Sequence, residues 1–526
     1  MHSTSFAYRR HFVKCSLGFG LLGWASGRVA WGVDELNSET KMDLDWQSLS
    51  GSSKGPWRRL FLDGAVIEEQ MGLRKVFHSA QKFEGNPILK ADRPWEGKAA
   101  ITGPYVYGSI LREGNLLRMW YQVLHEGNHV GYAESQDGIQ WTKVVQNVIS
   151  YEGQATNFVV SDLDANRTGG HCHNPSVIDR GTQVDPRRRY VLYGYDGSVS
   201  QPRVAYSADG LHWRYAESKG LFSSSDVVNF GWDPYAQRYY CTWKTRNRRG
   251  RAVGLALSQD GESWHKLYDG PIFVADDLDP DDTQIYGMPV FAYQGMYIGL
   301  PWMYRARYFR HGEYSIPKLH EAQADSSRKM EVQLAWSWDM VNWTRPKQRD
   351  EFLPLGPKDA WDDGMIVTAK APIVMGDQLY FYYGGADEVH DDKRAQAGIG
   401  LAKLRLDGFC SMETEKEGWL RTRREVMRSP SIWINAKTAP GGSVVAELLD
   451  RKNRVIEGFS KEDCHAFEGD AVRHTLTWTK KELPKKAMES DVKIRFWLRN
   501  AQLYSYLPTD LDPKEPDLAR FPEAGP

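Results

Sequence analysis

The segment Leu255-Ala-Leu-Ser-Gln-Asp-Gly-Glu-Ser-Trp264 decides the fold, because its cadence recurs three more times along the chain. The other copies are Tyr132-Ala-Glu-Ser-Gln-Asp-Gly-Ile-Gln-Trp141, Ala205-Tyr-Ser-Ala-Asp-Gly-Leu-His-Trp213 and Leu334-Ala-Trp-Ser-Trp-Asp-Met-Val-Asn-Trp343. Each reads as a strand that ends in Ser-x-Asp-(Gly)-x-x-Trp. A degenerate fifth copy runs from Ile399 to Phe409, with Phe409 in place of the tryptophan.

The repeated pattern predicts a hairpin turn at the end of a strand in every copy. The Asp accepts hydrogen bonds from its own turn, the Gly takes a positive φ, and the Trp fills the gap between neighbouring sheets. The aromatic ends fall at positions 141, 213, 264, 343 and 409. This spacing exceeds the ~40–45 residues of short propeller repeats but suits four-stranded blades with long insertions. The sequence therefore predicts an all-β protein with a five-bladed β-propeller.

The extent of the repeats divides the chain into domains. We expect the propeller, the candidate catalytic domain, at residues 76–415, after a lead-in segment at 33–75. Beyond it, segments such as Ser431–Ala436 and Ser443–Leu449 alternate apolar and polar residues on either side of Pro440-Gly441-Gly442. Alternation of this kind predicts a C-terminal β-sandwich at 416–507. The tail at 508–526 is rich in Pro, Asp and Glu and is expected to be loose.

Composition excludes several classes of protein. The 526 residues include 67 Lys and Arg against 68 Asp and Glu, a net charge of −1. A nucleic-acid or acidic-membrane binder would show a basic excess, so neither partner is expected. With 41% hydrophobic residues the chain can bury a core, so it is not a disordered protein.

The N-terminal residues predict export. Tyr8-Arg9-Arg10-His11-Phe12-Val13-Lys14 precedes a weakly apolar stretch. This order resembles a bacterial twin-arginine signal, which we expect at residues 1–32, with a periplasmic or extracellular mature protein. No later segment reaches ~18 uninterrupted apolar residues, so no membrane span is expected. The cysteines at 172, 241, 410 and 464 are far apart, and both free thiols and disulfides stay open.

The predicted domain order resembles a known group of enzymes. A five-bladed propeller followed by a β-sandwich is similar to glycoside hydrolase family 32 and its family 43 and 68 relatives. In the second domain the resemblance is carried by Ile434-Asn435-Ala436, the Gly-Gly turn, Val445–Asp450, Val455–Ser460, Asp463-Cys464 and Gly469-Asp470. It implies an exported glycoside hydrolase that acts on an oligo- or polysaccharide and uses no redox cofactor. The sequence has no Trp-Met-Asn-Asp-Pro-Asn motif, so we do not extend it to fructan cleavage.

Candidate catalytic residues come from the positions before the innermost strand of each blade, because these positions converge in a propeller. Glycosidic cleavage needs one carboxyl group that donates a proton and a second that attacks or activates water. Glu96, Asp226 and Asp282 form the preferred trio, with Asp363 in reserve. The same positions supply the candidate substrate-binding residues Trp95, Tyr105, His173, Asn174, Asn229, Tyr286, Trp361, Asp362 and Lys370.

Other interpretations of these residues stay open. The acidic run from Asp276 to Asp282 is a solvated loop or a structural calcium site, and His171-Cys172-His173 is a polar lining or a zinc site. The basic run from Arg246 to Arg251 is a solvated hairpin tip or a contact for an anionic sugar. The alternative functions are a carbohydrate-binding propeller without catalysis and a sialidase-like hydrolase, because the repeated turn resembles the Asp-box of sialidases.

Overall fold

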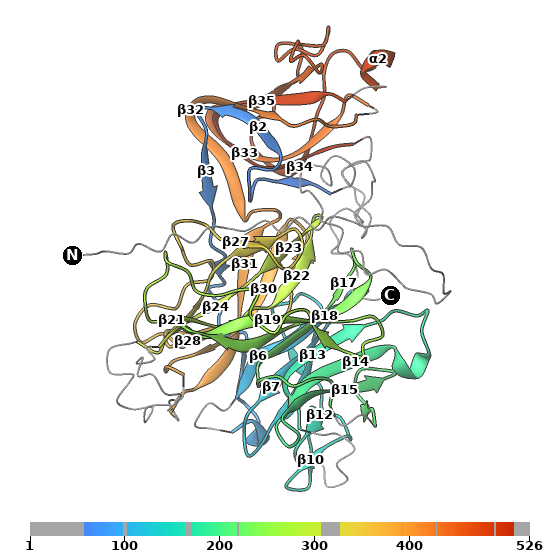
Figure 1. Ribbon diagram of the computed structural model, residues 1–526, viewed down its shortest axis with the longest axis vertical. Coiled ribbons are helices and arrows are strands. Elements are labelled where there is room, and N and C mark those ends of the chain that lie inside the picture. Colours follow the sequence, from blue (N-terminus) through green and yellow to red (C-terminus); the bar gives the residue numbers. More distant parts are fainter. Residues whose placement is uncertain are drawn as a thin grey trace, which may run out of the picture. The chain divides into compact units, whose positions relative to one another are not determined.

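The computed structural model describes residues 57–97, 103–163, 171–217, 220–306, 327–390, 392, 394–427, 429–488 and 491–509 (Figure 1). The predicted signal at 1–32, the lead-in up to residue 56 and the tail from residue 510 lie outside these ranges. The described residues form an all-β protein with a propeller and a β-sandwich-like group of strands, as the sequence predicts. Short helices are η1 (Pro94–Glu96), η2 (Pro186–Arg188) and α2 (Lys485–Met488). Within the described ranges, no helix has the length and hydropathy needed to traverse a bilayer.

The first three repeats form separate antiparallel sheets that follow the chain order outward from the innermost strand. The first contains β6 (Pro104–Glu113), β7 (Leu116–Val123), β8 (His129–Ser135), β9 (Thr142–Lys143) and β12 (Phe158–Ser161). The second contains β13 (His173–Asp179), β14 (Tyr190–Asp196), β15 (Gln201–Ser207) and β16 (Arg214–Tyr215). The third contains β17 (Val228–Asp233), β18 (Arg238–Asn247), β19 (Gly250–Ser258) and β20 (His265–Lys266). The small hairpin β10 (Ser150–Tyr151) and β11 (Gln154–Ala155) is inserted before β12.

The remaining strands differ from the predicted count of five blades. One four-stranded sheet contains β22 (Val290–Tyr293), β23 (Met296–Gly299), β26 (Ala335–Ser337) and β27 (Trp343–Thr344). The other strands form one nine-stranded sheet: β21 (Thr283–Gly287), β24 (Trp302–Arg305), β25 (Met330–Val332), β28 (Met365–Thr368), β29 (Ile373–Met375), β30 (Gln378–Ala386), β31 (Ala397–Arg405), β4 (Gln81–Lys82) and β5 (Leu89–Lys90). The structure thus has four separate blade-like sheets and one larger sheet. The larger sheet combines the fifth repeat with the inner segments β21, β24 and β25 of the fourth repeat, because a parallel bridge joins Met330 to Met365.

The repeated turns have the predicted hydrogen bonds. In the third copy, Asp260 accepts from the backbone N–H groups of Glu262 and Ser263 at 2.8 and 2.7 Å, and Gly261 has a φ of 80°. Trp264 donates its indole N–H to the carbonyl of Gly261 at 3.0 Å and packs edge-on against Tyr193 of the preceding blade. The turn therefore links one blade to the next, which is the role that the sequence predicts for the tryptophan.

The same turn also closes the ring of blades. The hydroxyl of Tyr382 on β30 donates to the carbonyl of Gly138, in the turn of the first blade, at 2.9 Å. Trp141 of that turn packs edge-on against Tyr382. The N-terminal strands β4 and β5 pair with β31, so the sheet at the end of the propeller contains chain from its beginning. Closure of this kind brings the innermost strands of distant repeats together.

The C-terminal strands form a single bent sheet of seven strands (Figure 1). It contains β1 (Arg59–Leu60), β2 (Ile67–Met71), β3 (Arg74–Phe77), β32 (Cys410–Thr422), β33 (Ile432–Leu449), β34 (Asp470–Leu476) and β35 (Lys493–Pro508). The expected turn at Pro440-Gly441-Gly442 lies inside β33, where the pairing register with β35 shifts. It is a bulge that bends one long strand, since bulges increase local bending and twist. Residues 59–77, most of which the sequence assigned to a lead-in, belong to this sheet.

Candidate active site

Aromatic and polar side chains gather where the innermost strands of the propeller begin. The Tyr107 ring on β6 contacts the His173 ring on β13, with centroids 5.4 Å apart. Tyr107 also stacks on Trp302 of β24 at 5.5 Å. Burial raises the pKa of Tyr107 well above its ordinary value, and the neighbouring Tyr286 and Asp226 raise it further. We name Tyr107, His173, Asp226, Lys244 and Tyr286 the inner cluster.

An ion pair anchors this inner cluster. Lys244 on β18 lies 2.7 Å from the Asp226 carboxylate and 4.5 Å from the centre of the Tyr286 ring. Burial alone would raise the pKa of Asp226, but the charge and hydrogen bond of Lys244 hold it well below its ordinary value. The Asp226 side chain is 45% exposed, so this carboxylate is accessible to a ligand. Burial lowers the pKa of His173 to about 4, which leaves the ring neutral at pH 7.

A second group of predicted residues meets around Lys370. Its ammonium group donates to the side-chain oxygens of Asn174 on β13 and Asn229 on β17, both at 2.8 Å, and to the carbonyl of Val228 at 3.2 Å. These residues come from three different repeats and are all buried. Their meeting is what the sequence predicts for positions at the inner strands. Burial keeps them from direct contact with a large substrate, so we assign them to the support of the site.

The side-chain N–H groups of Asn174 and Asn229 have no hydrogen-bond partner among the described residues. Asn174 also has a φ of 59°, in the left-handed region that most residues avoid. Buried donors without partners are rare in folded proteins. The centre of the propeller therefore carries polar groups that its core does not need.

Carboxyl groups of two kinds lie beside β24. Asp282 precedes β21 and forms an ion pair with Arg305, with nitrogen–oxygen distances of 2.7 and 2.8 Å. Glu331 lies on the neighbouring strand β25, directly across from Met303. Burial raises the pKa of Glu331 to about 7, with further contributions from the charges of Glu351 and Asp282, which outweigh that of Arg305. A carboxyl group that is half protonated at pH 7 therefore lies near an ion-paired carboxylate.

The structure does not place Glu96 and Trp95 with the other candidates. Glu96 is fully buried and pairs at 2.5 Å with Lys143 of β9, on the side of the first blade opposite the innermost strand β6. It also accepts from the Tyr121 hydroxyl at 2.9 Å. Trp95 is buried beside it and donates to the side chain of Asn157 at 2.8 Å. The prediction that Glu96 joins Asp226 and Asp282, with Trp95 as a pocket wall, is wrong for this reason.

The remaining candidates are held by local contacts. Tyr105 is buried and packs edge-on against Tyr107 at 5.0 Å. Asp362 pairs with Lys82 at 2.6 Å, and Trp361 stacks on Tyr383. Asp363 accepts from the Asp359 backbone N–H at 3.1 Å and lies 3.7 Å from Lys329.

The acidic loop has cationic partners in the structure. Asp279 pairs with the buried guanidinium group of Arg345, and Asp276 with that of Arg349. Across the described ranges, no group of three or more His, Cys, Asp or Glu side chains is arranged to hold a metal ion.

Several residues of the site were not among the sequence candidates. Tyr107 is the fourth residue of β6, and Glu331 lies on the third strand of its repeat. Arg305 ends β24, and Lys244 follows Trp243, the residue of β18 that pairs with the start of β17. None of these residues directly precedes an innermost strand. In an antiparallel blade, however, the end of the second strand lies beside the start of the first. That rule would have found Lys244 and Arg305, and no local signal marks Glu331.

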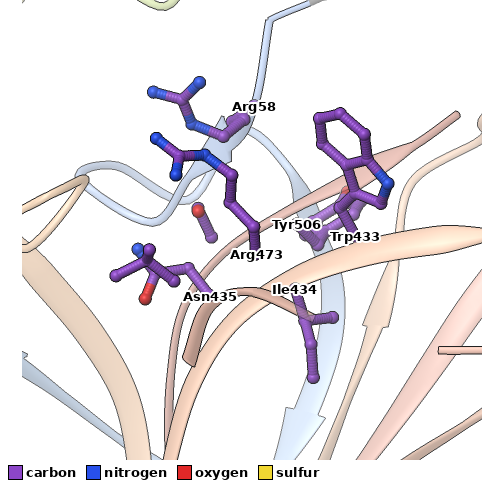
Figure 2. Close-up of a pocket in the computed structure, with 8 residues that line it drawn as sticks. Arg58, Trp433, Ile434, Asn435, Arg473 and Tyr506 are labelled. Atoms are coloured by element: carbon purple, nitrogen blue, oxygen red, sulfur yellow. The ribbon is translucent and has the colours of Figure 1, made fainter. Parts of the chain in front are cut away.

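A recess elsewhere in the protein is lined by Arg58, Trp433, Ile434, Asn435, Val472, Arg473, Ser505 and Tyr506 (Figure 2). Arg58 pairs with the buried Asp407 at 2.6 Å, and Arg473 donates to Asp377 at 2.9 Å. Asn435 accepts from Arg405 at 2.6 Å. Arg58, Arg473 and Asn435 thus take part in structural contacts, and no residue that lines the recess is a predicted site residue.

Comparison with known proteins yields structural likenesses alone. The chain matches no family model and no curated protein sequence. A glycosyl hydrolase from Bacteroides ovatus is 14% identical, with 63% of this chain and 94% of that chain covered and a TM-score of 0.41. A second structure is described for the GH130 family of mannoside phosphorylases, which contains glycoside hydrolases that target β-1,2 mannosidic linkages in Candida mannan. It is 15% identical, with 63% of this chain and 94% of that chain covered and a TM-score of 0.42. A fructofuranosidase from Schwanniomyces occidentalis is 10% identical, with 82% and 98% covered and a TM-score of 0.37. Likenesses at this level do not assign an activity to the chain.

Proposed function

We propose that this chain is an exported glycoside hydrolase in which Glu331 donates a proton and Asp282 acts as the second carboxylate. The observation that carries this proposal is the placement of both groups beside β24, with Arg305 holding Asp282 in an ion pair at 2.7 Å. Glycosidic cleavage requires one protonated and one ionised carboxyl group at the same pH. A cluster in which one carboxyl group faces a guanidinium and another is partly desolvated meets that requirement.

In the proposed reaction, neutral Glu331 protonates the oxygen of the leaving sugar. The Asp282 carboxylate attacks the anomeric carbon or activates the water that attacks it. The products are a hemiacetal, which gains the hydroxyl group of water, and a leaving sugar, which gains a proton. The inner cluster supplies the contacts that position the substrate, because Asp226 is exposed and is fixed by Lys244.

The test uses the mature protein and a panel of plant and algal glycans, with release of reducing ends as the measurement. We expect Glu331→Gln to lower kcat by about 10²–10⁴, the usual contribution of a general acid. Asp282→Asn should cause a comparable loss. Asp350→Asn changes an exposed carboxyl group near Glu351 and should leave turnover unchanged.

The pH profile provides a second criterion. A proton donor must be protonated, so activity should fall as pH rises through about 7, the pKa to which burial raises Glu331. Full turnover by Glu331→Gln would refute its role as proton donor. Glycan binding without turnover by the wild-type protein would instead support the alternative of a carbohydrate-binding propeller. The twin-arginine pattern at Arg9-Arg10 supports the export part of the proposal.

A further inference from the structure

The β18–β19 hairpin presents three cations on one face. Side chains two positions apart on a strand share a face, so Lys244 and Arg246 point the same way. Arg251 lies directly across from Arg246 in the register of the two strands, and therefore joins them on that face. Lys244 and Arg251 also lie over the Tyr286 ring, 4.5 and 5.3 Å from its centre. The sequence left open whether this basic run is a solvated hairpin tip or a sugar contact.

This arrangement works against the stability of the hairpin. Like charges directly opposite each other in a sheet are destabilising, and Arg246 and Arg251 occupy such a pair of positions. Burial lowers the pKa of Lys244, and the charges of Arg251 and Arg246 lower it further, whereas Asp226 opposes the effect. The three cations are thus close enough to repel one another. The Asp226 carboxylate, 2.7 Å from Lys244, offsets part of this repulsion, and an anion bound beside the three cations would offset more of it.

Neighbouring groups fix Arg251 in place. Arg251 also lies 4.7 Å from the centre of the Tyr304 ring, and its backbone N–H donates to the Gln284 side chain at 3.0 Å. Tyr286 and Tyr304 are buried, so they serve as platforms for the cations and not as stacking surfaces for a sugar. Arg246 is exposed, which leaves one side of the group open to solvent.

We propose that the substrate is an anionic glycan whose carboxylate or sulfate groups are bound by Lys244, Arg246 and Arg251. This inference rests on the proposed function for its substrate class, and it concerns binding and not the catalytic step. Guanidinium groups bind carboxylate and sulfate oxygens through paired N–H donors, which accounts for two arginines beside the lysine. The overall charge of −1 conceals this local concentration of cations.

The test measures binding of three matched trisaccharides by isothermal titration calorimetry: trigalacturonate, a sulfated galactotriose and neutral galactotriose. Wild-type protein should bind one of the two anionic sugars at least tenfold more tightly than the neutral one, and the difference should shrink as salt is raised. Preference for trigalacturonate or for the sulfated sugar identifies the group that is recognised. Equal affinity for all three sugars would overturn the proposal.

Variants of the hairpin locate the site. Arg251→Gln and Arg246→Gln should each weaken binding of the preferred anionic sugar about tenfold and leave neutral galactotriose unchanged. Arg248→Gln is the matched control, because Arg248 is exposed on the same hairpin outside the three-cation group. Thermal unfolding checks that each variant is folded. If Arg251→Gln is unstable, Arg246→Gln still tests the proposal, because Arg246 is exposed and its replacement should not disturb the fold.

The outcomes separate this inference from the proposed function. Selective anion binding that Arg251→Gln or Arg246→Gln removes, without cleavage of any glycan, would uphold the site and refute the hydrolase. Cleavage of neutral glycans that is insensitive to both variants would uphold the hydrolase and refute the anionic substrate.

Discussion

Replacing Lys370 with methionine should change how the free energy of unfolding depends on pH. Burial lowers the pKa of this lysine from its ordinary 10.5 to about 7. Between these two pH values the unfolded chain carries a proton that the folded chain has released. Unfolding therefore takes up a proton, and the stability of the wild-type protein rises with pH over this window. Below pH 7 both states are protonated, so the lysine contributes no pH dependence there.

The magnitude follows from the width of that window. One pH unit corresponds to about 1.4 kcal/mol, so the full difference between 7 and 10.5 is worth about 5 kcal/mol. Three acceptors surround the amine, from Asn174, Asn229 and Val228, and they favour its charged form. We therefore expect a gain of about 3–5 kcal/mol for wild type relative to Lys370→Met across this window.

The assay is urea unfolding followed by tryptophan fluorescence at pH 6, 7, 8, 9 and 10. Loss of the three hydrogen bonds in Lys370→Met changes the free energy of unfolding by the same amount at every pH. The relevant quantity is therefore how the difference in unfolding free energy between wild type and variant changes with pH. Lys347→Met, at an exposed lysine, is the control and should give a flat difference. A flat difference for Lys370→Met as well would refute the burial argument.

Three further predictions test other parts of the structure. Asp407→Asn should lower the free energy of unfolding by about 3–5 kcal/mol, measured by urea unfolding, because it removes the negative charge that pairs with the buried guanidinium of Arg58; a loss below about 1 kcal/mol would contradict this. Glu351→Gln should shift the alkaline limb of the pH–activity profile to lower pH, because the Glu351 charge helps to raise the pKa of Glu331; an unmoved limb would show that Glu331 is not the titrating group. In the folded mature protein, a thiol reagent at pH 8 should label none of the four free, buried cysteines, and all four should react after denaturation: Cys172, Cys241, Cys410 and Cys464.

The propeller is predictable from the sequence because its signal is local and repeated. Ser258, Asp260 and Gly261 specify a turn through contacts within four residues, and three other copies repeat the pattern. The blade count is less predictable, since it depends on a single bridge between Met330 and Met365, which no local pattern encodes. The bend in β33 is likewise hard to predict, because Pro-Gly-Gly is compatible with both a bulge and a chain reversal.

The candidate site was predictable only where a residue lies on or next to an innermost strand. Asn174 and Asn229 are the second residues of β13 and β17, and Lys370 follows β28, so the closed ring brings all three together. Glu96 lies eight residues before the start of β6, which is far enough for the intervening chain to carry it to the outer strand of its blade. Glu331 could not be found from the sequence, because its role depends on desolvation and on charges contributed by distant segments.

Several departures from favourable local chemistry occur in the inner part of the propeller. Like charges oppose each other at Arg246 and Arg251, a lysine is buried at 370, Asn174 has a positive φ, and Glu331 holds a proton near neutral pH. Each feature costs stability, and each lies on an inner strand, next to one, or in the β18–β19 hairpin, whose first strand pairs with the inner strand β17. Proteins retain such costs mainly where function requires them. The repeated turns, by contrast, mostly follow the local rules; the exceptions are Met340, which has a φ of 63° where the other copies have glycine, and the buried indole N–H of Trp213, which has no partner among the described residues. This contrast points to the inner end of the propeller as the functional part of the molecule, on grounds that are independent of its resemblance to any enzyme.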